Sequence, residues 1–320
     1  MKYIEINIKD IVLGGKGFDA YLVSFPLENQ SVAASVQKIG IINPPVLAAC
    51  AKGKYKIVCG YKKIAACKKF GKKKITAKVF GRGELDDRTA LLTAITENAV
   101  SRGLNAVEIS LALNKLQKLH IPIDEAVLKL LDIPVHLVLE YAGLWQLETN
   151  IKKAVVEGIL TPAHAFLLAK LGREDRNTLG GLLVRSIRPN INETKEIVQY
   201  LDDLKIKFSK RRMSDVLALD GLEQILASGE LNPREKVDRL RDALKRLRYP
   251  LISEKEDGFR QKLKGAGLPN SILVSHAKYF EGNELKIECK FKTVEELKSI
   301  LAKISEKESV IRELLRIVRE

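Results

Sequence analysis

The first hundred residues alternate between two patterns of hydrophobic and polar positions, one with a period of two residues and one with the period of a helix. The first pattern predicts strands, and the second, with apolar residues three and four apart, predicts helices. A C-cap is expected at Gly40, and Pro44 with Pro45 forces an extended backbone into the segment that follows. The expected strands are residues 3–8, 46–48, 55–59 and 75–80, with a hairpin between the second and third, and the expected helices are 28–39 and 61–70. Residues 1–100 are therefore predicted to be an α/β domain.

From residue 86 onward the spacing of apolar residues is helical almost throughout. Pro122 and Pro134 lie at the starts of expected helices, where a missing backbone N–H costs nothing. The expected helices are 88–98, 106–119, 123–131, 135–147, 151–157, 162–171, 193–204 and 234–248. Residues 101–249 are therefore predicted to be an all-α, helix-turn-helix-like domain.

A small α+β unit is expected over residues 250–320, after a break at Pro250. Two strand-like segments, 271–274 and 285–291, precede Thr293, which is expected to cap one long final helix running towards residue 317. A hairpin and a helix of this size bury too little surface to be stable alone. We therefore expect this unit to pack against a second copy and make the protein a homodimer.

The sequence argues against a membrane-spanning segment and against a zinc site. The longest apolar runs, such as residues 163–171, are far shorter than the roughly 20 residues that cross a bilayer. The N-terminus lacks the apolar stretch of a signal peptide, so we expect no membrane partner and a cytoplasmic protein. The four cysteines and four histidines are scattered singly, and this spacing does not predict a zinc site.

Positive charge is concentrated in one segment. The formal net charge is +15, and residues 51–82 contain twelve Lys or Arg and no Asp or Glu, so 15 − 12 leaves +3 for the rest of the chain. A solvated surface normally mixes both signs, because unrelieved repulsion destabilises the fold. The segment is therefore interpreted as one that contacts phosphate groups.

Part of this segment has a geometry that suits an anion. Gly60 separates the expected strand 55–59 from the expected helix 61–70, so free backbone N–H groups at the helix start face an anion beside the glycine. The loop is too short and has too few glycines for a Walker A or dinucleotide-binding site. A phosphate site of another kind is expected there.

Three sequence blocks, in this order, resemble the ParB family of chromosome and plasmid partition proteins. The first is residues 35–47, with Asn43 where the family usually has Gln. The second, Gly60-Tyr61-Lys62-Lys63-Ile64-Ala65-Ala66, is similar to the family's Gly-Glu-Arg-Arg-x-Arg-Ala box, and the third, Glu97-Asn98 followed by residues 104–108, resembles its Glu-Asn-x-x-Arg box and the next helix. Residues 157–165 are similar to a later family segment. The resemblance covers residues 1–171.

The resemblance implies a nucleotide site that holds CTP and Mg²⁺. Carried over by position, the nucleotide-binding residues are Asn43, Gly60, Lys62, Lys63, Glu97, Asn98 and Arg102, and the metal-binding residues are Glu97 and Asn98. Tyr61 stands where the family has an acidic residue, Ala65 where it has a second basic one, and Ser101 where the third box has its arginine. Phosphoryl transfer depends on accurately placed charge, so these departures favour nucleotide binding over hydrolysis.

The resemblance also places a helix-turn-helix over residues 124–141. The second helix offers His136 and Glu140 as polar groups, whereas base reading needs Arg, Lys, Asn or Gln at the helix start. An ordinary packed helix and a DNA-reading helix are therefore both open, and contacts to the DNA backbone are expected from basic residues elsewhere. The predicted DNA-binding residues are Lys72, Lys73, Lys74, His136, Lys210, Arg211 and Arg212.

The leading hypothesis is a ParB-like DNA-binding protein that acts in chromosome or plasmid partition, or as a related DNA-associated regulator. The resemblance implies that it acts as a CTP-dependent clamp on DNA, with degenerate hydrolysis of the nucleotide. It would be associated with the nucleoid or a plasmid, and a partition ATPase is a candidate partner. One alternative is a nuclease or phosphoryl-transfer enzyme built on the same fold. Another is an adaptor that keeps the fold for protein contacts alone.

Overall fold

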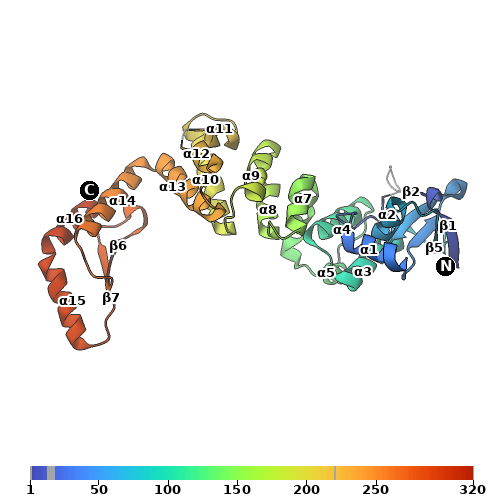
Figure 1. Cartoon of the computed structure of the whole chain (residues 1–320), viewed down its shortest axis with the longest axis horizontal. Coiled ribbons are helices and arrows are strands. Elements are labelled where there is room, and N and C mark those ends of the chain that lie inside the picture. The colour runs from blue at the N-terminus through green and yellow to red at the C-terminus, as the bar shows by residue number, and fades with distance from the viewer. Residues whose placement is uncertain (1, 13–18, 220, 320) are drawn as a thin grey trace. The chain divides into compact units, whose positions relative to one another are not determined.

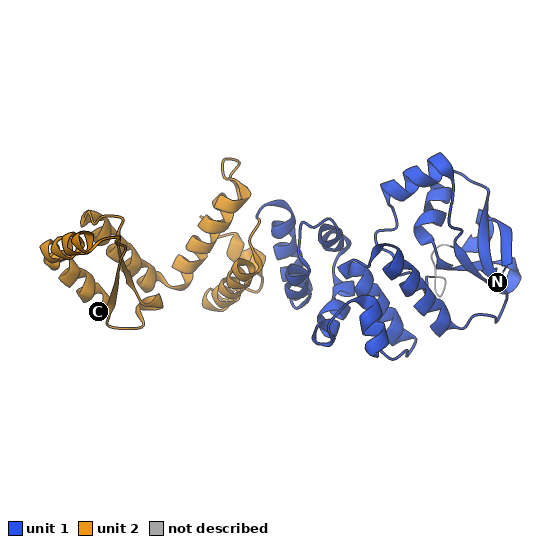
Figure 2. Ribbon diagram, turned by 90° about the horizontal axis from the view of Figure 1, so that it is seen from below, with its two compact units in different colours: residues 1–187 blue, residues 188–320 orange. Residues whose placement is uncertain are grey.

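The computed structural model describes residues 2–12, 19–219 and 221–319 of the chain. It divides into two compact units, residues 1–187 and residues 188–320 (Figure 2). The division into three domains at residues 100 and 249 is finer than this and stays a prediction.

A five-stranded mixed sheet forms the N-terminal part of the first unit (Figure 1). Its strand order is β1-β5-β3-β4-β2; β1–β5 and β3–β4 pair antiparallel, and β5–β3 and β4–β2 pair parallel. The strands are β1 (Lys2–Asn7), β2 (Ile11–Val12), β3 (Val46–Ala49), β4 (Tyr55–Cys59) and β5 (Lys74–Phe80). The predicted strands and the hairpin are confirmed, and β2 is an addition to them.

Helices cover both faces of the sheet. Neighbouring residues of β4 point to opposite sides, and each side packs into its own hydrophobic core. On one side Ile57 shares a core with α1 (Gln30–Ile39) and α2 (Tyr61–Lys69). On the other side Val58 packs among α3 (Asp87–Arg102), α4 (Ala106–Lys118) and α5 (Glu125–Leu131). The predicted α/β domain followed by a mostly helical region is therefore observed.

The caps of α1 lie close to their expected positions. The side chain of Asn29 accepts a hydrogen bond from the backbone N–H of Val32 at 2.9 Å and so starts the helix two residues later than predicted. Gly40 ends it with φ +80°, in the left-handed region that favours glycine.

The rest of the first unit is helical but more broken than predicted. The helix expected over 135–147 is divided into two short 3₁₀ turns, Val135–Leu137 and Leu144–Gln146, around α6 (Val138–Gly143). Between α5 and this segment, Asp132 takes a left-handed conformation at φ +54°. The remaining helices are α7 (Thr149–Val156), α8 (Pro162–Ala169) and α9 (Arg173–Arg185).

The second unit begins with a helical bundle and ends in a hairpin flanked by helices. Its elements are α10 (Ile191–Lys207), α11 (Met213–Leu217), α12 (Leu222–Ala227), α13 (Pro233–Arg248), α14 (Pro250–Gly265), β6 (Ile272–His276), β7 (Leu285–Cys289), α15 (Val294–Glu306) and α16 (Glu308–Arg319). The two strands pair antiparallel, as predicted. The helix predicted over 234–248 ends at Arg248, before Pro250, as expected. Pro250 then occupies the first turn of α14, a helix that was not predicted, where its missing N–H costs nothing.

The prediction of a single final helix is wrong. Thr293 caps α15 as predicted, by accepting a hydrogen bond from the backbone N–H of Glu296 at 3.2 Å, but the helix ends at Glu306 and α16 begins at Glu308. The change of direction lets Leu314 and Val318 of α16 join Phe259 of α14 in one buried cluster. A straight helix would carry those apolar side chains away from that core.

Candidate functional site

α2 begins at a glycine that another residue would not fit. Gly60 is the N-cap of the helix and has φ +93°. A Cβ atom built on it would lie 2.7 Å from the Cβ of Pro45 and 3.1 Å from its Cα. The strand–glycine–helix arrangement is therefore present, with Pro45 packed directly against the start of the helix.

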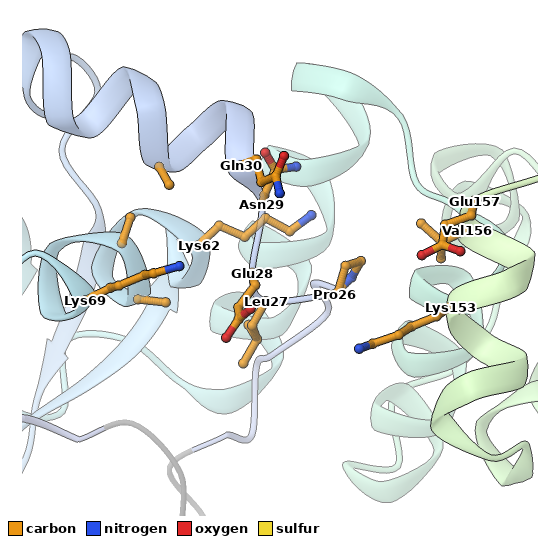
Figure 3. A pocket seen from close by; sticks show the side chains of 13 residues that line it. Pro26, Leu27, Glu28, Asn29, Gln30, Lys62, Lys69, Lys153, Val156 and Glu157 are labelled. Carbon is orange, nitrogen blue, oxygen red and sulfur yellow. The ribbon is translucent and has the colours of Figure 1, made fainter.

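A cavity of about 630 Å³ lies between α2, the segment 26–30 and α7. Lys62 and Lys69 extend from α2 towards this space, and Lys153 extends into it from α7 on the opposite side (Figure 3). The remaining lining residues are Pro26, Leu27, Glu28, Asn29, Gln30, Ala33, Ala65, Ala66, Val156 and Glu157. Its size is within the range of small-molecule sites, and its wall combines apolar side chains with ammonium groups.

A buried carboxylate lies behind Lys62, where α2, α3 and α4 meet. The side chain of Glu108 is fully buried and accepts hydrogen bonds from both terminal nitrogens of Arg102, each at 2.7 Å. It also accepts from Lys62 Nζ at 3.4 Å and from the backbone N–H groups of Phe25 at 2.9 Å and Asn105 at 3.2 Å. A buried charge is tolerated when it is paired and hydrogen-bonded, and Glu108 meets both conditions.

Asn98 extends this network along α3. Its Oδ1 accepts hydrogen bonds from Arg102 Nη2 at 2.8 Å and from Ser24 Oγ at 3.3 Å, and its Nδ2 donates to the carbonyl of Ala94 at 2.8 Å. The network thus connects Ser24 and Phe25, which precede the cavity-lining segment 26–30, to α3 and α4.

Lys62 is a partly desolvated cation. Its side chain is 13% exposed, and burial lowers the pKa of its ammonium group, an effect that Glu108 opposes and Arg102 reinforces. An ammonium group that has lost much of its water interacts more strongly with an anion than one in bulk solvent. The inner wall of the cavity therefore presents a partly buried ammonium group that is paired with Glu108.

The structure separates the seven predicted nucleotide-binding residues into four places. Lys62 lines the cavity, and Asn98 and Arg102 reach it indirectly through the Glu108 network. Lys63 faces the other way, with Nζ 3.8 Å from Glu97 Oε1. Gly60 starts α2, and Asn43 is exposed in the loop after α1. The roles of these residues as nucleotide or metal ligands stay predictions.

Three charged residues at or behind the cavity were not predicted. Lys69 follows Lys62 by seven residues, so helical spacing alone places both on one face of α2. Glu108 has a sequence signal in the Asn-x-x-Glu capping box that begins at Asn105. Lys153 has no such signal, because only the folded chain brings α7 beside α2.

The predicted DNA-binding residues are exposed but dispersed. Lys72, Lys73 and Lys74 follow α2, where Lys74 forms an exposed ion pair with Glu5 at 2.9 Å and Lys72 Nζ donates to a backbone carbonyl of α1 at 3.4 Å. His136 is exposed in the 3₁₀ turn before α6. Residues 210–212 are exposed between α10 and α11 of the second unit. That these residues bind DNA stays a prediction.

Basic residues of α13 form ion pairs inside the second unit. Arg234 and Arg241 both pair with Glu193 of α10, at 2.7 and 3.4 Å. Lys245 pairs with Glu256 of α14 at 2.6 Å. These pairs hold α13 against the helices before and after it, so their charges are directed inward to their partners.

The described residues contain neither a cluster of metal-binding side chains nor a helix that could cross a membrane. Over 2–12, 19–219 and 221–319, no three His, Cys, Asp or Glu side chains gather as a metal ion would require. In the same residues, no helix is both long enough and apolar enough to cross a membrane.

Comparison with known proteins confirms the resemblance over one segment. Residues 26–99 match the family model of the ParB N-terminal domain. Over 179 residues the chain is 28% identical to the nucleoid occlusion protein of Bacillus mycoides (strain KBAB4) and 27% identical to that of Bacillus anthracis (strain A0248). The matched part is 56% of this chain and spans 61% of the length of each relative.

Two solved structures show similarity at lower levels. One is the C-terminally truncated chromosome-partitioning protein ParB from Caulobacter crescentus complexed to the centromeric parS site, with 21% identity, a TM-score of 0.33, and 61% of this chain and 98% of that chain covered. The other is the same truncated protein complexed with CTP-γ-S, with 21% identity, a TM-score of 0.24, and 58% and 100% covered.

Proposed function

We propose that this chain, in which residues 26–99 are a ParB N-terminal domain, is a DNA-associated protein of the chromosome-partition and nucleoid-occlusion type that binds CTP with Mg²⁺. The observation that carries the proposal is the cavity beside α2. It lies within the matched domain on one side and presents Lys62 and Lys69 to a ligand. A triphosphate is the ligand class that best fits two ammonium groups two turns apart on one face of a helix.

Ala65 supports a nucleotide in this site. It lines the cavity between Lys62 and Lys69, at the position where the ParB pattern has a second basic residue. A small side chain there leaves apolar space in the wall, and Lys69, one turn later, supplies a positive charge in place of the missing one. The arrangement therefore favours binding of a nucleotide.

Lys62→Gln is expected to raise the Kd for CTP by about ten- to a hundredfold, because hydrogen bonds to charged groups contribute roughly 1.5–3 kcal/mol. Isothermal titration of the full chain with CTP, ATP, GTP and UTP, with and without Mg²⁺, measures this. Lys68→Gln is the matched control, since Lys68 is exposed on the same helix and does not line the cavity. Absence of CTP binding by the unaltered protein at millimolar concentration would show the nucleotide part of the proposal to be wrong.

Binding to DNA is the second part of the proposal. Random and candidate centromeric duplexes should both bind at low salt, and the affinity should fall steeply as salt is raised, because displaced counterions accompany phosphate contacts. Fluorescence anisotropy at two salt concentrations tests this, and lack of binding to either duplex at low salt contradicts it. Loss of intact DNA that depends on a divalent cation, and that Glu97→Ala abolishes, would favour the nuclease alternative instead.

Homodimerisation through the C-terminal hairpin is the third part. A two-stranded sheet is marginally stable alone, and large apolar side chains remain exposed around it: Leu273, Phe291, Val294 and Leu301. A second copy covering them would bury a shared apolar patch. Sedimentation equilibrium should report the mass of two chains, and Leu301→Glu should shift it towards one.

A further inference from the structure

Lys153 lies outside the matched ParB segment, yet it lines the same cavity as Lys62 and Lys69. The core-facing side of α7 is formed by Ile151, Ala154 and Val155, which are buried. Helical spacing then directs Lys153 away from that core, and Figure 3 shows its ammonium end reaching towards the segment that carries Leu27.

Lys153 is not held by a partner among the described residues. Lys153 is exposed, and no ion pair or side-chain hydrogen bond among the described residues involves it. Its neighbour Lys152 differs, because its Nζ donates to the backbone carbonyl of Trp145 at 2.5 Å. The ammonium group of Lys153 is therefore available to a ligand in the cavity.

Lysines from both sides of the cavity face the same space. Lys62 and Lys69 of α2 and Lys153 of α7 line it, together with the carboxylates of Glu28 and Glu157. Lys62 is in addition paired with Glu108. Like charges that face one another across a cavity repel, and an anion with several phosphate groups placed between them removes the repulsion on both sides.

We propose that Lys153 is a further ligand of the polyphosphate group, so that ligand binding joins α2 to α7. The inference rests on the proposed function, in which a triphosphate occupies this cavity. A bound ligand contacts Lys62, whose Nζ also contacts Glu108 of α4, and Lys153 of α7. Occupancy of the site thus acts on the helical region after residue 105 as well as on the ParB segment, and it restrains α7.

The test compares Lys153→Gln with Lys170→Gln in the full chain. Lys170 is a suitable control because it is a largely exposed lysine near the end of α8 and does not line the cavity. Lys153→Gln is expected to weaken CTP and inorganic tripolyphosphate by about tenfold, and CMP by much less, because one charged contact to the outer phosphates is lost. Lys170→Gln should bind like the unaltered protein.

Hydrogen exchange supplies a readout that a general loss of affinity does not imitate. Saturating CTP should slow amide exchange in residues 149–156 of the unaltered protein, and at equal occupancy this slowing should be absent in Lys153→Gln. Unchanged affinity in Lys153→Gln, or full protection of α7 at equal occupancy, overturns the inference.

The two proposals fail in different ways. If the unaltered protein binds neither CTP nor tripolyphosphate, the proposed function fails. If it binds them, and Lys62→Gln weakens binding while Lys153→Gln does not, only the role of Lys153 is wrong. If a short single-stranded oligonucleotide binds more tightly than CTP and Lys153→Gln weakens it, the phosphates belong to nucleic acid and the nucleotide assignment is overturned.

Discussion

Replacing Glu108 with alanine is expected to lower the free energy of unfolding of the first unit by about 3–5 kcal/mol, the range found when one partner of a buried ion pair is removed. The substitution leaves Arg102 and Lys62 without their shared counter-charge and removes the acceptor of two backbone N–H groups. Urea unfolding followed by circular dichroism measures the loss. Because Lys62 forms the cavity wall, the affinity for CTP should fall as well.

The chain contains its own control for this prediction. Glu235 occupies the same position in a capping box at the start of α13, but it is exposed. Glu235→Ala is therefore expected to cost less than about 1 kcal/mol, the value of an exposed acidic residue in a first helical turn. Glu108→Gln, which keeps an acceptor of similar shape, should fall between the two alanine variants. Equal losses for Glu108→Ala and Glu235→Ala would show that the buried network contributes little.

Gly60→Ala is the second substitution with a large expected effect, a loss of about 2–5 kcal/mol. A left-handed backbone costs a residue with a Cβ atom about 1–2 kcal/mol, and the overlap with Pro45 adds an overpacking cost of roughly 1–3 kcal/mol. Relief of that overlap has to move the start of α2, which carries Lys62. We therefore expect weaker CTP binding together with the loss of stability, measured by titration and by urea unfolding.

Gly71→Ala separates the two contributions. Gly71 also has a left-handed backbone, at φ +66°, but a Cβ atom there meets nothing within 4 Å. It should therefore lose only the backbone contribution, about 1–2 kcal/mol, and keep its affinity for CTP. If Gly60→Ala loses no more than Gly71→Ala, contact with Pro45 does not fix the helix start.

The sequence predicted elements whose signals are local. Four of the five strands of the sheet, the β3–β4 hairpin and α2 follow from short periodic segments bounded by glycine and proline, and no distant residue is needed to recognise them. α9 shows the opposite case. A pair of glycines such as Gly180 and Gly181 is typical of a turn, but both lie within α9. A Cβ atom on Gly180 would lie 2.6 Å from Ile151 Cδ1, so the glycine lets α7 pack closely against α9.

The candidate site, like the fold, was predictable where its residues are close in sequence and not where distant residues meet. Gly60 and Lys62 belong to one local segment, and a charge count together with the family pattern pointed to both. The partner of Lys62 was not predictable, because Glu108 follows it by 46 residues and meets it only when α2 and α4 pack. Lys63, its neighbour in sequence, points instead to Glu97. Adjacent lysines on a helix diverge by about 100°, and only the packing decides which of them faces the ligand.

The order of strands in the sheet has a consequence for how the nascent chain acquires its structure. The β3–β4 pair joins residues close in sequence, such as Leu47 and Ile57, and closes only a short loop. β1, although synthesised first, pairs with β5 across nearly seventy residues, as in the pair Ile6 and Ile75. β1 leaves the ribosome before β5 and therefore waits for it, so it completes the edge of the sheet after the hairpin has formed.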